Sequence, residues 1–390
     1  MSTYICSAAR TPIGAFQGSL KSISATELGS IAIKGSLDKL AIDVNLVNEV
    51  IMGNVLSANL GQAPARQAAL GAGLSINTEC LTINKVCGSG LKTVMLADQA
   101  IALDPSSIIV AGGMESMSRA PHYLENSRTG TMFGHSKTID SILKDGLWDP
   151  YNNLAMGSCG EILCQENQYT LDMQNKFAIE SYKKSIRAIK KGLFDNEIIP
   201  VNVINNKKEI EFKEDEEPLR FNEEKLIKLK PAFEKNGTIT AGNASSLSDG
   251  TAALVLVSEK KAKEMNIIPL AKILGHVSFA TEPVYFTKAP IFAISKLLKK
   301  MDMDIGEIDL FEINEAFSCV TMAAIEELGI NPEKVNINGG AVSMGHPIGA
   351  SGARILVTLI HALKSKGLKY GIASLCIGGG EASSILVEIV

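Results

Sequence analysis

The segment CLTINKVCGSG, residues 80–90, decides the fold of this chain. Its first half, Cys80–Asn84, is a short β-branched run that is typical of a strand. Apolar side chains then recur at helical spacing through Gly90–Leu103, and a further strand is expected at Ser107–Ala111. Such alternation of strands and helices predicts a layered α/β fold.

The second half of the chain repeats this order. A strand is expected at Val335–Asn338, followed by the sequence GGAVSMGHPIGASG (339–352) and by a helix over Gly352–Lys364. We interpret the repeat as a duplicated domain, which would place a cysteine and a histidine at matching turns that face each other. Chance similarity between glycine-rich α/β turns is the alternative interpretation.

The region between the two halves breaks the alternation of strands and helices. A segment of this length is too long for an ordinary connection, which predicts an inserted subdomain at 119–240. A strand at Thr251–Ser258 then rejoins the first domain. The predicted organisation is therefore a first domain of residues 1–118 plus 241–268, the insertion, and a second domain of residues 269–390.

Composition excludes several classes of function. The chain has 390 residues, 38 of them Lys or Arg against 42 Asp or Glu, and its net charge of −4 argues against a nucleic-acid partner. No apolar stretch approaches the roughly 18 residues that a membrane span needs, and no secretory signal is visible, so we expect a cytoplasmic enzyme without a membrane partner. Seven cysteines, an odd number without zinc-type spacing, predict free thiols.

Cys87 and His346 are the first candidates for chemistry. Cys87 stands at the start of an expected helix, where backbone N–H groups and the helix dipole lower the pKa of a thiol. Gly88 and Gly90 are expected to leave space for a substrate beside the sulfur. Four glycines and a proline around His346 fix the direction of its imidazole, which could take a proton from a thiol and stabilise an oxyanion.

Two further segments leave their roles open. Asn314 follows the apolar strand Leu310–Ile313, either as a ligand-binding side chain at a strand end or as the cap of a helix that begins near Phe317. Cys376 precedes three glycines, whose backbone amides could surround an anion or merely form a loose turn.

Taken together, these segments resemble the thiolase family from end to end. The resemblance rests on six motifs in the family's order, namely ARTPIG (9–14), the Cys87 turn, GGMES (112–116), NEAF (314–317), GHP (345–347) and Cys376 with its glycines. It implies the thiolase fold, with two duplicated βαβαβαββ domains that form a five-layered α/β core and a loop domain inserted into the first. This agrees with the repeat and the insertion.

The resemblance also implies a mechanism. Cys87 would carry the acyl group as a thioester after activation by His346, and Cys376 would move a proton to or from the α-carbon of acetyl-CoA. Asn314, through a water molecule, and His346 Nε2 would form one oxyanion hole, and the N–H groups of Cys87 and Gly378 a second. Acetyl-CoA, acetoacetyl-CoA and coenzyme A are the implied ligands, and no metal or redox cofactor is required.

Three segments are most similar to the mitochondrial-type acetoacetyl-CoA thiolases, namely MGSC (156–159), KEDEE (213–217) and EPVYF (282–286). In that subtype, the phenylalanine that matches Phe286 is associated with acceptance of substrates that carry a 2-methyl branch. Ser118–Ile142 resembles the family's tetramerisation loop, which implies a homotetramer built from dimers. The implied contacts of coenzyme A are Met156, Arg220, Phe233, Ala241, Ser245, Ala316 and Phe317.

The mitochondrial subtype also binds potassium, and here the sequence differs. Pro218 stands where that subtype has a tyrosine ligand. Backbone carbonyls could still line a site, namely those of Ala241, Gly242, Ala244 and Val342. Because proline offers no hydroxyl ligand, we expect weak or absent activation by potassium.

Four other functions are alternatives to this one. A condensing enzyme of fatty-acid synthesis would pair the nucleophilic cysteine with two histidines. In this chain Asn314 and Cys376 occupy the motifs that supply the partners of the cysteine. A non-catalytic scaffold would not need all four polar residues, and a Cys-His-Asn hydrolase has no use for Cys376. A 3-ketoacyl-CoA thiolase of broader chain length remains open.

Overall fold

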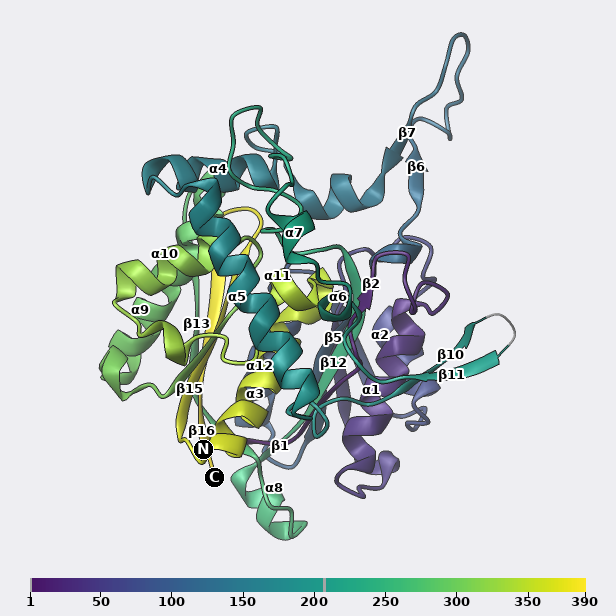
Figure 1. Ribbon diagram of the computed structural model, residues 1–390. Coiled ribbons are helices and arrows are strands. Elements are labelled where there is room, and N and C mark those ends of the chain that lie inside the picture. Colours follow the sequence, from purple (N-terminus) through teal and green to yellow (C-terminus); the bar gives the residue numbers. More distant parts are fainter. Residues whose placement is uncertain (1, 206–207) are drawn as a thin grey trace.

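The computed structural model describes residues 2–205 and 208–390, and its first half forms one side of a continuous ten-stranded sheet (Figure 1). The first half-sheet has the strand order β4-β3-β5-β12-β1. In chain order its elements are β1 (Thr3–Arg10), α1 (Ala25–Asp38), β3 (Glu49–Gly53), α2 (Pro64–Gly71), β4 (Glu79–Ile83), α3 (Ser89–Leu103), β5 (Ile108–Ser116) and β12 (Ser248–Ser258). The short strand β2 (Gly14–Ala15) pairs with β12.

The second half-sheet has the order β14-β15-β16-β13 and joins the first where β13 pairs with β1. Its elements are β13 (Ala271–Ala280), α9 (Ala289–Met301), β14 (Leu310–Ile313), α10 (Ser318–Leu328), α11 (Ala341–Met344), α12 (Ile348–Lys366), β15 (Tyr370–Ile377) and β16 (Glu381–Ile389). A further helix, α8 (Glu259–Glu264), connects the halves.

The predicted strand at Val335–Asn338 is wrong. Val335 makes only a single parallel bridge to Phe311. Asn336 has φ +46°, and its side-chain amide bonds to both backbone groups of Ile313, with Ile313 N to Oδ1 at 2.9 Å and Nδ2 to Ile313 O at 2.8 Å. A side chain therefore replaces the backbone ladder that a strand would have formed here.

Even so, pairing within the two half-sheets confirms the duplication. In the first half, β3 lies parallel between β4 and β5, and β12 then pairs antiparallel with β5 and with β1. In the second, β14 lies parallel between the Val335 bridge and β15, and β16 pairs antiparallel with β15 and with β13. Counted within each half, the order is the same, which chance similarity of turns does not explain.

Two helices from different halves form the central layer. α3 and α12 pack on each other between the half-sheets, while α1 and α2 cover one outer face and α9 and α10 the other, which gives five layers (Figure 1). Almost every residue of α12 is buried, as expected for a helix covered on all sides. A Cβ on Gly90 would lie 2.8 Å from Ala353 N, and one on Gly352 would lie 2.4 Å from Leu91 N. Glycine thus lets the first turns of the two helices touch.

Elements between β5 and β12 lie outside the half-sheets. They are β6 (His122–Leu124), β7 (Thr138–Asp140), β8 (Trp148–Asp149), β9 (Leu154–Ala155), α4 (Met156–Glu166), α5 (Leu171–Lys190), β10 (Val201–Asn205), β11 (Lys208–Phe212), α6 (Glu216–Leu219) and α7 (Glu223–Leu226). The β6–β7 hairpin projects from the body of the protein, whereas α4 and α5 pack against helices of the second half (Figure 1). The domain boundaries drawn from the sequence stay a prediction.

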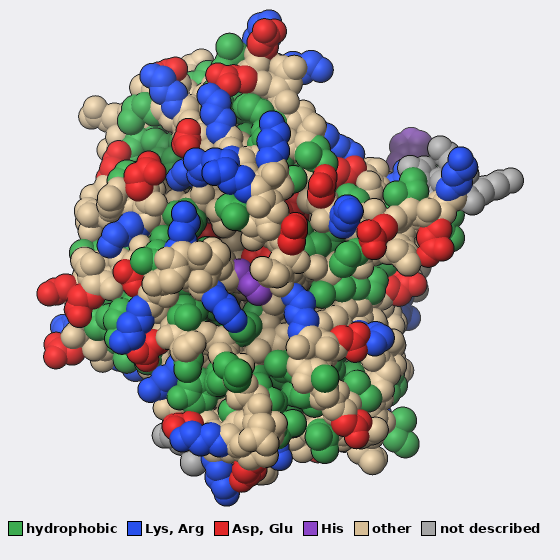
Figure 2. Space-filling view, turned by 60° about the horizontal axis from the view of Figure 1, so that its bottom comes forward, with side chains coloured by type: hydrophobic (Ala, Val, Ile, Leu, Met, Phe, Trp, Pro, Cys, Tyr) green, Lys and Arg blue, Asp and Glu red, His purple; other side chains and the backbone are tan. Residues whose placement is uncertain are grey.

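The surface carries charges of both signs. Figure 2 shows one face on which Lys and Arg side chains alternate with Asp and Glu, without a large region of one sign. Among the described residues, no helix combines the length and the apolar character that crossing a bilayer requires.

Candidate active site

A cavity of about 360 Å³ opens where several strands of both half-sheets end. Cys87, His346 and Gly378 form part of its wall, and α4 contributes Met156. The carboxyl ends of strands in an α/β sheet are the usual place for a ligand. The two halves therefore meet at one concave site.

The turn before α3 presents Cys87 to this cavity. Asn84 Oδ1 accepts a hydrogen bond from Val86 N at 2.9 Å, and Gly88 N donates to Lys85 O at 3.0 Å. Val86 adopts φ +46°, a left-handed conformation that is unusual for a β-branched residue. The tight turn leaves Cys87 half-buried at its tip, two residues before the helix begins.

The thiol of Cys87 is protonated in the free enzyme. Burial raises its pKa to about 11, although the backbone N–H groups of Gly378 and of Cys87 itself hydrogen-bond to the sulfur and oppose this rise. The expectation of a lowered pKa from the helix start alone is therefore wrong for the free enzyme. Desolvation outweighs the helix terminus, so Cys87 needs a base.

The glycines beside Cys87 serve packing between the halves. A Cβ on Gly88 would lie 2.3 Å from Ile377 Cδ1, and the space at Gly90 is taken by Ala353. The expectation that both glycines leave room for substrate is thus wrong, because protein atoms fill that space. Because Gly88 has no side chain, Ile377, the neighbour of Cys376, can approach the Cys87 turn.

His346 is held as a neutral base. Its Nδ1 lies 2.5 Å from Ser351 Oγ, and that hydroxyl donates to Pro347 O at 3.0 Å. Since the single hydroxyl hydrogen goes to the carbonyl, Nδ1 carries the imidazole proton and Nε2 keeps its lone pair. Burial, followed by the positive charge of Arg354, lowers the pKa of His346 to about 3. Nε2 has no hydrogen-bond partner among the residues that the structure describes.

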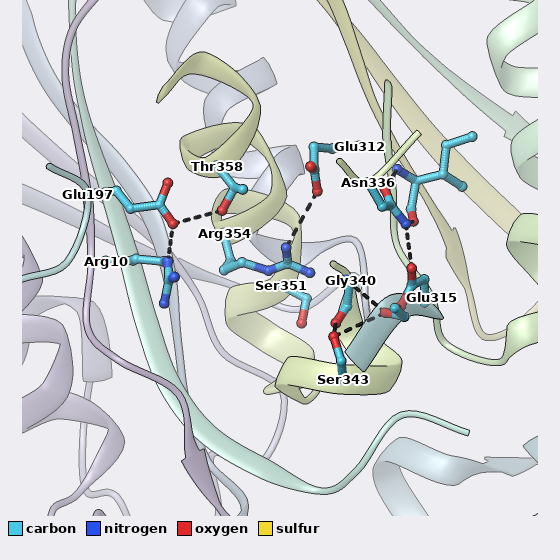
Figure 3. A network of polar contacts seen from close by, with 12 residues as sticks. Arg10, Glu197, Glu312, Glu315, Asn336, Gly340, Ser343, Ser351, Arg354 and Thr358 are labelled. Atoms are coloured by element: carbon cyan, nitrogen blue, oxygen red, sulfur yellow. Dashed lines mark hydrogen bonds and ion pairs between the residues drawn. The ribbon is translucent and has the colours of Figure 1, made fainter. Parts of the chain in front are cut away.

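Buried polar contacts fix α12, the helix that follows His346. Figure 3 shows Ser351, Arg354 and Thr358 on this helix. Arg354 Nη1 lies 3.6 Å from Glu312 Oε2, and Thr358 donates to Glu197 Oε1 at 3.1 Å. These contacts orient the helix whose first turn carries the partner of His346.

Asn314 is a free amide rather than a helix cap. The N-cap of α10 is Phe317, and it makes no side-chain cap, so the capping interpretation is wrong. The side chain of Asn314 is buried, and neither its Oδ1 nor its Nδ2 has a partner within the described part of the chain. Its backbone N donates to Ser374 O at 3.0 Å, which places it beside the end of β15. Glu315 anchors the next position by accepting from Asn336 Nδ2 at 2.8 Å (Figure 3).

Cys376 lies deeper than the glycine-rich turn predicts. It is completely buried near the end of β15 and is not part of the cavity wall. Burial, and after it the repulsion between two thiolates if Cys87 were also ionised, raises the pKa of Cys376 well above the usual value, so in the free enzyme it is a thiol. The sequence-based requirement of a pKa near the working pH is not met in this state.

Most of the predicted coenzyme A contacts come together. Met156, Phe233, Ala241, Ser245, Phe286, Ala316 and Phe317 all line the cavity. Phe233 and Phe317 meet edge to face with ring centroids 6.1 Å apart. Arg220 is the exception, because it lies outside the wall in an ion pair with Glu216.

Sequence reasoning missed the apolar part of the wall and the partner of His346. The missed wall residues include Met117, Leu143, Leu147, Leu247 and Ile348. All seven cysteines are free, as predicted. Within residues 2–205 and 208–390, no group of three or more His, Cys, Asp or Glu side chains could hold a metal ion.

Comparison with known proteins agrees with this geometry. The family model "Thiolase, N-terminal domain" matches residues 3–260, and "Thiolase, C-terminal domain" matches residues 267–389. Acetyl-CoA acetyltransferase 2 of Arabidopsis thaliana is 51% identical over 389 residues, which cover 99% of this chain and 96% of the relative. The mitochondrial acetyl-CoA acetyltransferase of Homo sapiens is 50% identical over 386 residues, 98% of this chain and 90% of the relative.

Solved structures give the same result. The Acat5 thiolase of Ascaris suum in complex with coenzyme A superposes with a TM-score of 0.95 at 44% identity, covering 100% of both chains. The acetyl-CoA acetyltransferase of Bacillus anthracis has a TM-score of 0.97 at 40% identity, covering 100% of this chain and 99% of the other. The chain therefore belongs to the thiolase family.

Proposed function

We propose that this protein is an acetyl-CoA C-acetyltransferase, which reversibly converts two acetyl-CoA molecules into acetoacetyl-CoA and coenzyme A. One observation carries the proposal: Cys87, with two backbone N–H groups at its sulfur, lines the same cavity as a neutral histidine whose Nε2 has no partner among the described residues. The names of the relatives support the same activity.

In the first half-reaction Cys87 is acetylated. His346 Nε2 accepts the thiol proton while the sulfur attacks the carbonyl carbon of acetyl-CoA. The N–H groups of Cys87 and Gly378 stabilise the tetrahedral oxyanion. The bond from the carbonyl carbon to coenzyme A then breaks, and Cys376 gives its proton to the departing thiolate.

That transfer leaves Cys376 as the base for the second half-reaction. It removes a proton from the methyl group of a second acetyl-CoA, and the enolate is stabilised by protonated His346 and, through a water molecule, by Asn314. The enolate carbon attacks the acetyl group on Cys87, acetoacetyl-CoA forms, and the Cys87 thiolate takes back its proton from His346. A proton donor in the first half-reaction suits the raised pKa of Cys376 in the free enzyme.

Coenzyme A enters as a substrate, and we propose that no metal or redox cofactor is used, because the thioester itself acidifies the α-carbon.

Phe286 lines the cavity and is 3% exposed, which suits short acyl groups with the 2-methyl branch as the largest substituent.

A cytoplasmic homotetramer is the proposed form of the enzyme. On the β6–β7 hairpin, Met132 and Phe133 are fully exposed at 102% and 100% of their reference area. Two apolar side chains on a projecting hairpin favour burial against another copy of the chain.

The proposed activity is tested by steady-state thiolysis of acetoacetyl-CoA, 2-methylacetoacetyl-CoA and longer 3-ketoacyl-CoAs with coenzyme A, with Cys87→Ala as the control. We expect the C4 substrate, or its 2-methyl form, to have the highest kcat/KM and the variant to be inactive. Preference for long chains would favour the broader-chain thiolase, and turnover by the variant would overturn the assignment of Cys87.

A further inference from the structure

An ion pair joins two turns from opposite halves of the molecule, namely the turn that carries Cys87 and the turn that carries Gly378. Lys85 Nζ pairs with Glu381 Oε2, with side chains 22% and 36% exposed. Lys85 stands two residues before Cys87, and Glu381 begins β16, three residues after Gly378. No step of the proposed mechanism uses either side chain.

On the first side, Lys85 belongs to a turn with little freedom. Its backbone N donates to Ser89 Oγ at 2.8 Å, and that hydroxyl donates to Val86 O at 2.7 Å. Because Val86 is held at φ +46°, the turn needs such restraints to keep its conformation. A displacement of Lys85 therefore also displaces Cys87, which lies two residues later in the same turn.

On the second side, Glu381 closes the turn that carries Gly378. It pairs with Ile377 across the β15–β16 hairpin, and Gly379 and Gly380 between them have φ +92° and +86°. Ile377 is also the residue that packs against Gly88. The ion pair and this apolar contact are thus two adjacent links between the same two turns.

We propose that the Lys85–Glu381 ion pair is a positioning element that sets the distance of Cys87 from Gly378 and Cys376. The proposal rests on the proposed function for its effect on turnover. A partly exposed ion pair adds little to global stability, so its consequence lies in alignment. Small misplacement of reacting groups can cost up to about 100-fold in rate.

The tests are Lys85→Met, Glu381→Gln and the charge exchange Lys85→Glu with Glu381→Lys. We expect each single change to lower kcat about tenfold with KM changed less than threefold. The alkylation rate of Cys87 by iodoacetamide should also change at least threefold, because the N–H of Gly378 no longer sits as well at the sulfur. The exchange should restore both rates to within threefold of wild type, and Lys85→Arg should keep them.

Matched controls are Lys369→Met and Glu388→Gln, which break another ion pair, at 3.0 Å, whose residues do not line the cavity. These should leave both rates unchanged. Single variants with wild-type rates, or an exchange no better than the singles, would overturn the proposal. Alkylation is measured without substrate, so the positioning role is tested even if the wild-type protein fails to cleave acetoacetyl-CoA.

Discussion

His346 Nδ1 and Ser351 Oγ lie 2.5 Å apart, and this contact determines what the histidine can do. The hydroxyl is itself bound to Pro347 O, so it can only accept from the imidazole. Nε2 is thereby kept as an acceptor on the side of the cavity. One serine in the first turn of α12 thus selects the tautomer that can deprotonate Cys87.

Replacing Ser351 with Ala should lower kcat about 10- to 100-fold, since a hydrogen bond to a group that becomes charged contributes about 1.5–3 kcal/mol. Stopped-flow measurement of Cys87 acetylation should show the same loss, with little change in KM. Ser365→Ala, which removes a hydroxyl near the far end of α12, is the control. Acetylation at the wild-type rate in Ser351→Ala would rule out the assigned tautomer.

Cys87 should be the first thiol to react with limiting iodoacetamide. It lines the cavity and is half-buried, whereas five of the cysteines are buried. Cys80 is the natural competitor because it is also half-buried, and burial raises the pKa of both thiols, but Cys80 lies outside the cavity wall that Cys87 shares with His346. Peptide mass spectrometry checks the order, and acetoacetyl-CoA should protect Cys87 alone. Earlier labelling of Cys80 would contradict the prediction.

The sequence predicts those site residues that local chemistry marks. Cys87, Asn314 and His346 each follow a strand or stand among glycines; Cys87 and His346 line the cavity, and Asn314 lies buried beside the end of β15. The wall residues Leu143 and Leu147 could not be found in this way, because they lie in an irregular segment and bear no chemical group. Ser351 is hidden for a similar reason, since one hydroxyl in a run of small residues carries no local signal.

Errors in the fold and in the pKa values have a common cause, namely distant contacts. The strand expected at 335–338 fails because the amide of Asn336 bonds to Ile313, far away in sequence. The expected low pKa of Cys87 fails because side chains distant in sequence, among them Met117 and Ile348, pack against this residue and the sulfur is desolvated. Local pattern predicts the elements and their order, but not how closely the halves approach.

Cys376→Ala should separate the two half-reactions. Acetylation of Cys87 from acetyl-CoA should still occur at a reduced rate, while exchange of the methyl protons of acetyl-CoA into D₂O should fall at least 100-fold. Mass spectrometry of the trapped acetyl-enzyme and NMR of the exchange measure the two steps. Changing Cys319, another buried thiol, to Ala is the matched control. Exchange at the wild-type rate without Cys376 would remove it as the base.

Potassium should not activate this enzyme strongly. α6, which carries Pro218, packs against α11, which carries Val342, so proline lies beside the predicted carbonyl site without offering a hydroxyl. Replacing NaCl with KCl at equal ionic strength should change kcat/KM less than twofold. Pro218→Tyr tests the reason, because it should gain potassium dependence if the other ligands are in place. A several-fold rise for the wild type would contradict the prediction.

His346 should also make the stability of the protein depend on pH. Its pKa is about 3 when folded against 6.5 as the ordinary value, so between these limits the unfolded chain binds a proton that the folded chain does not. Stability is therefore complete above pH 6.5 and is lost as the pH falls, by about 2 kcal/mol at pH 5 from this group. Urea unfolding at pH 7 and pH 5, at one protein concentration, should show this loss reduced by that amount in His346→Asn.

Two other buried groups titrate in both proteins, so the difference between the proteins isolates His346. They are His361, whose pKa burial also lowers, and Glu115, whose pKa burial raises to about 7. Equal pH dependence in the two proteins would mean that the folded state admits the proton, and the neutral state assigned to His346 in the free enzyme would then be wrong.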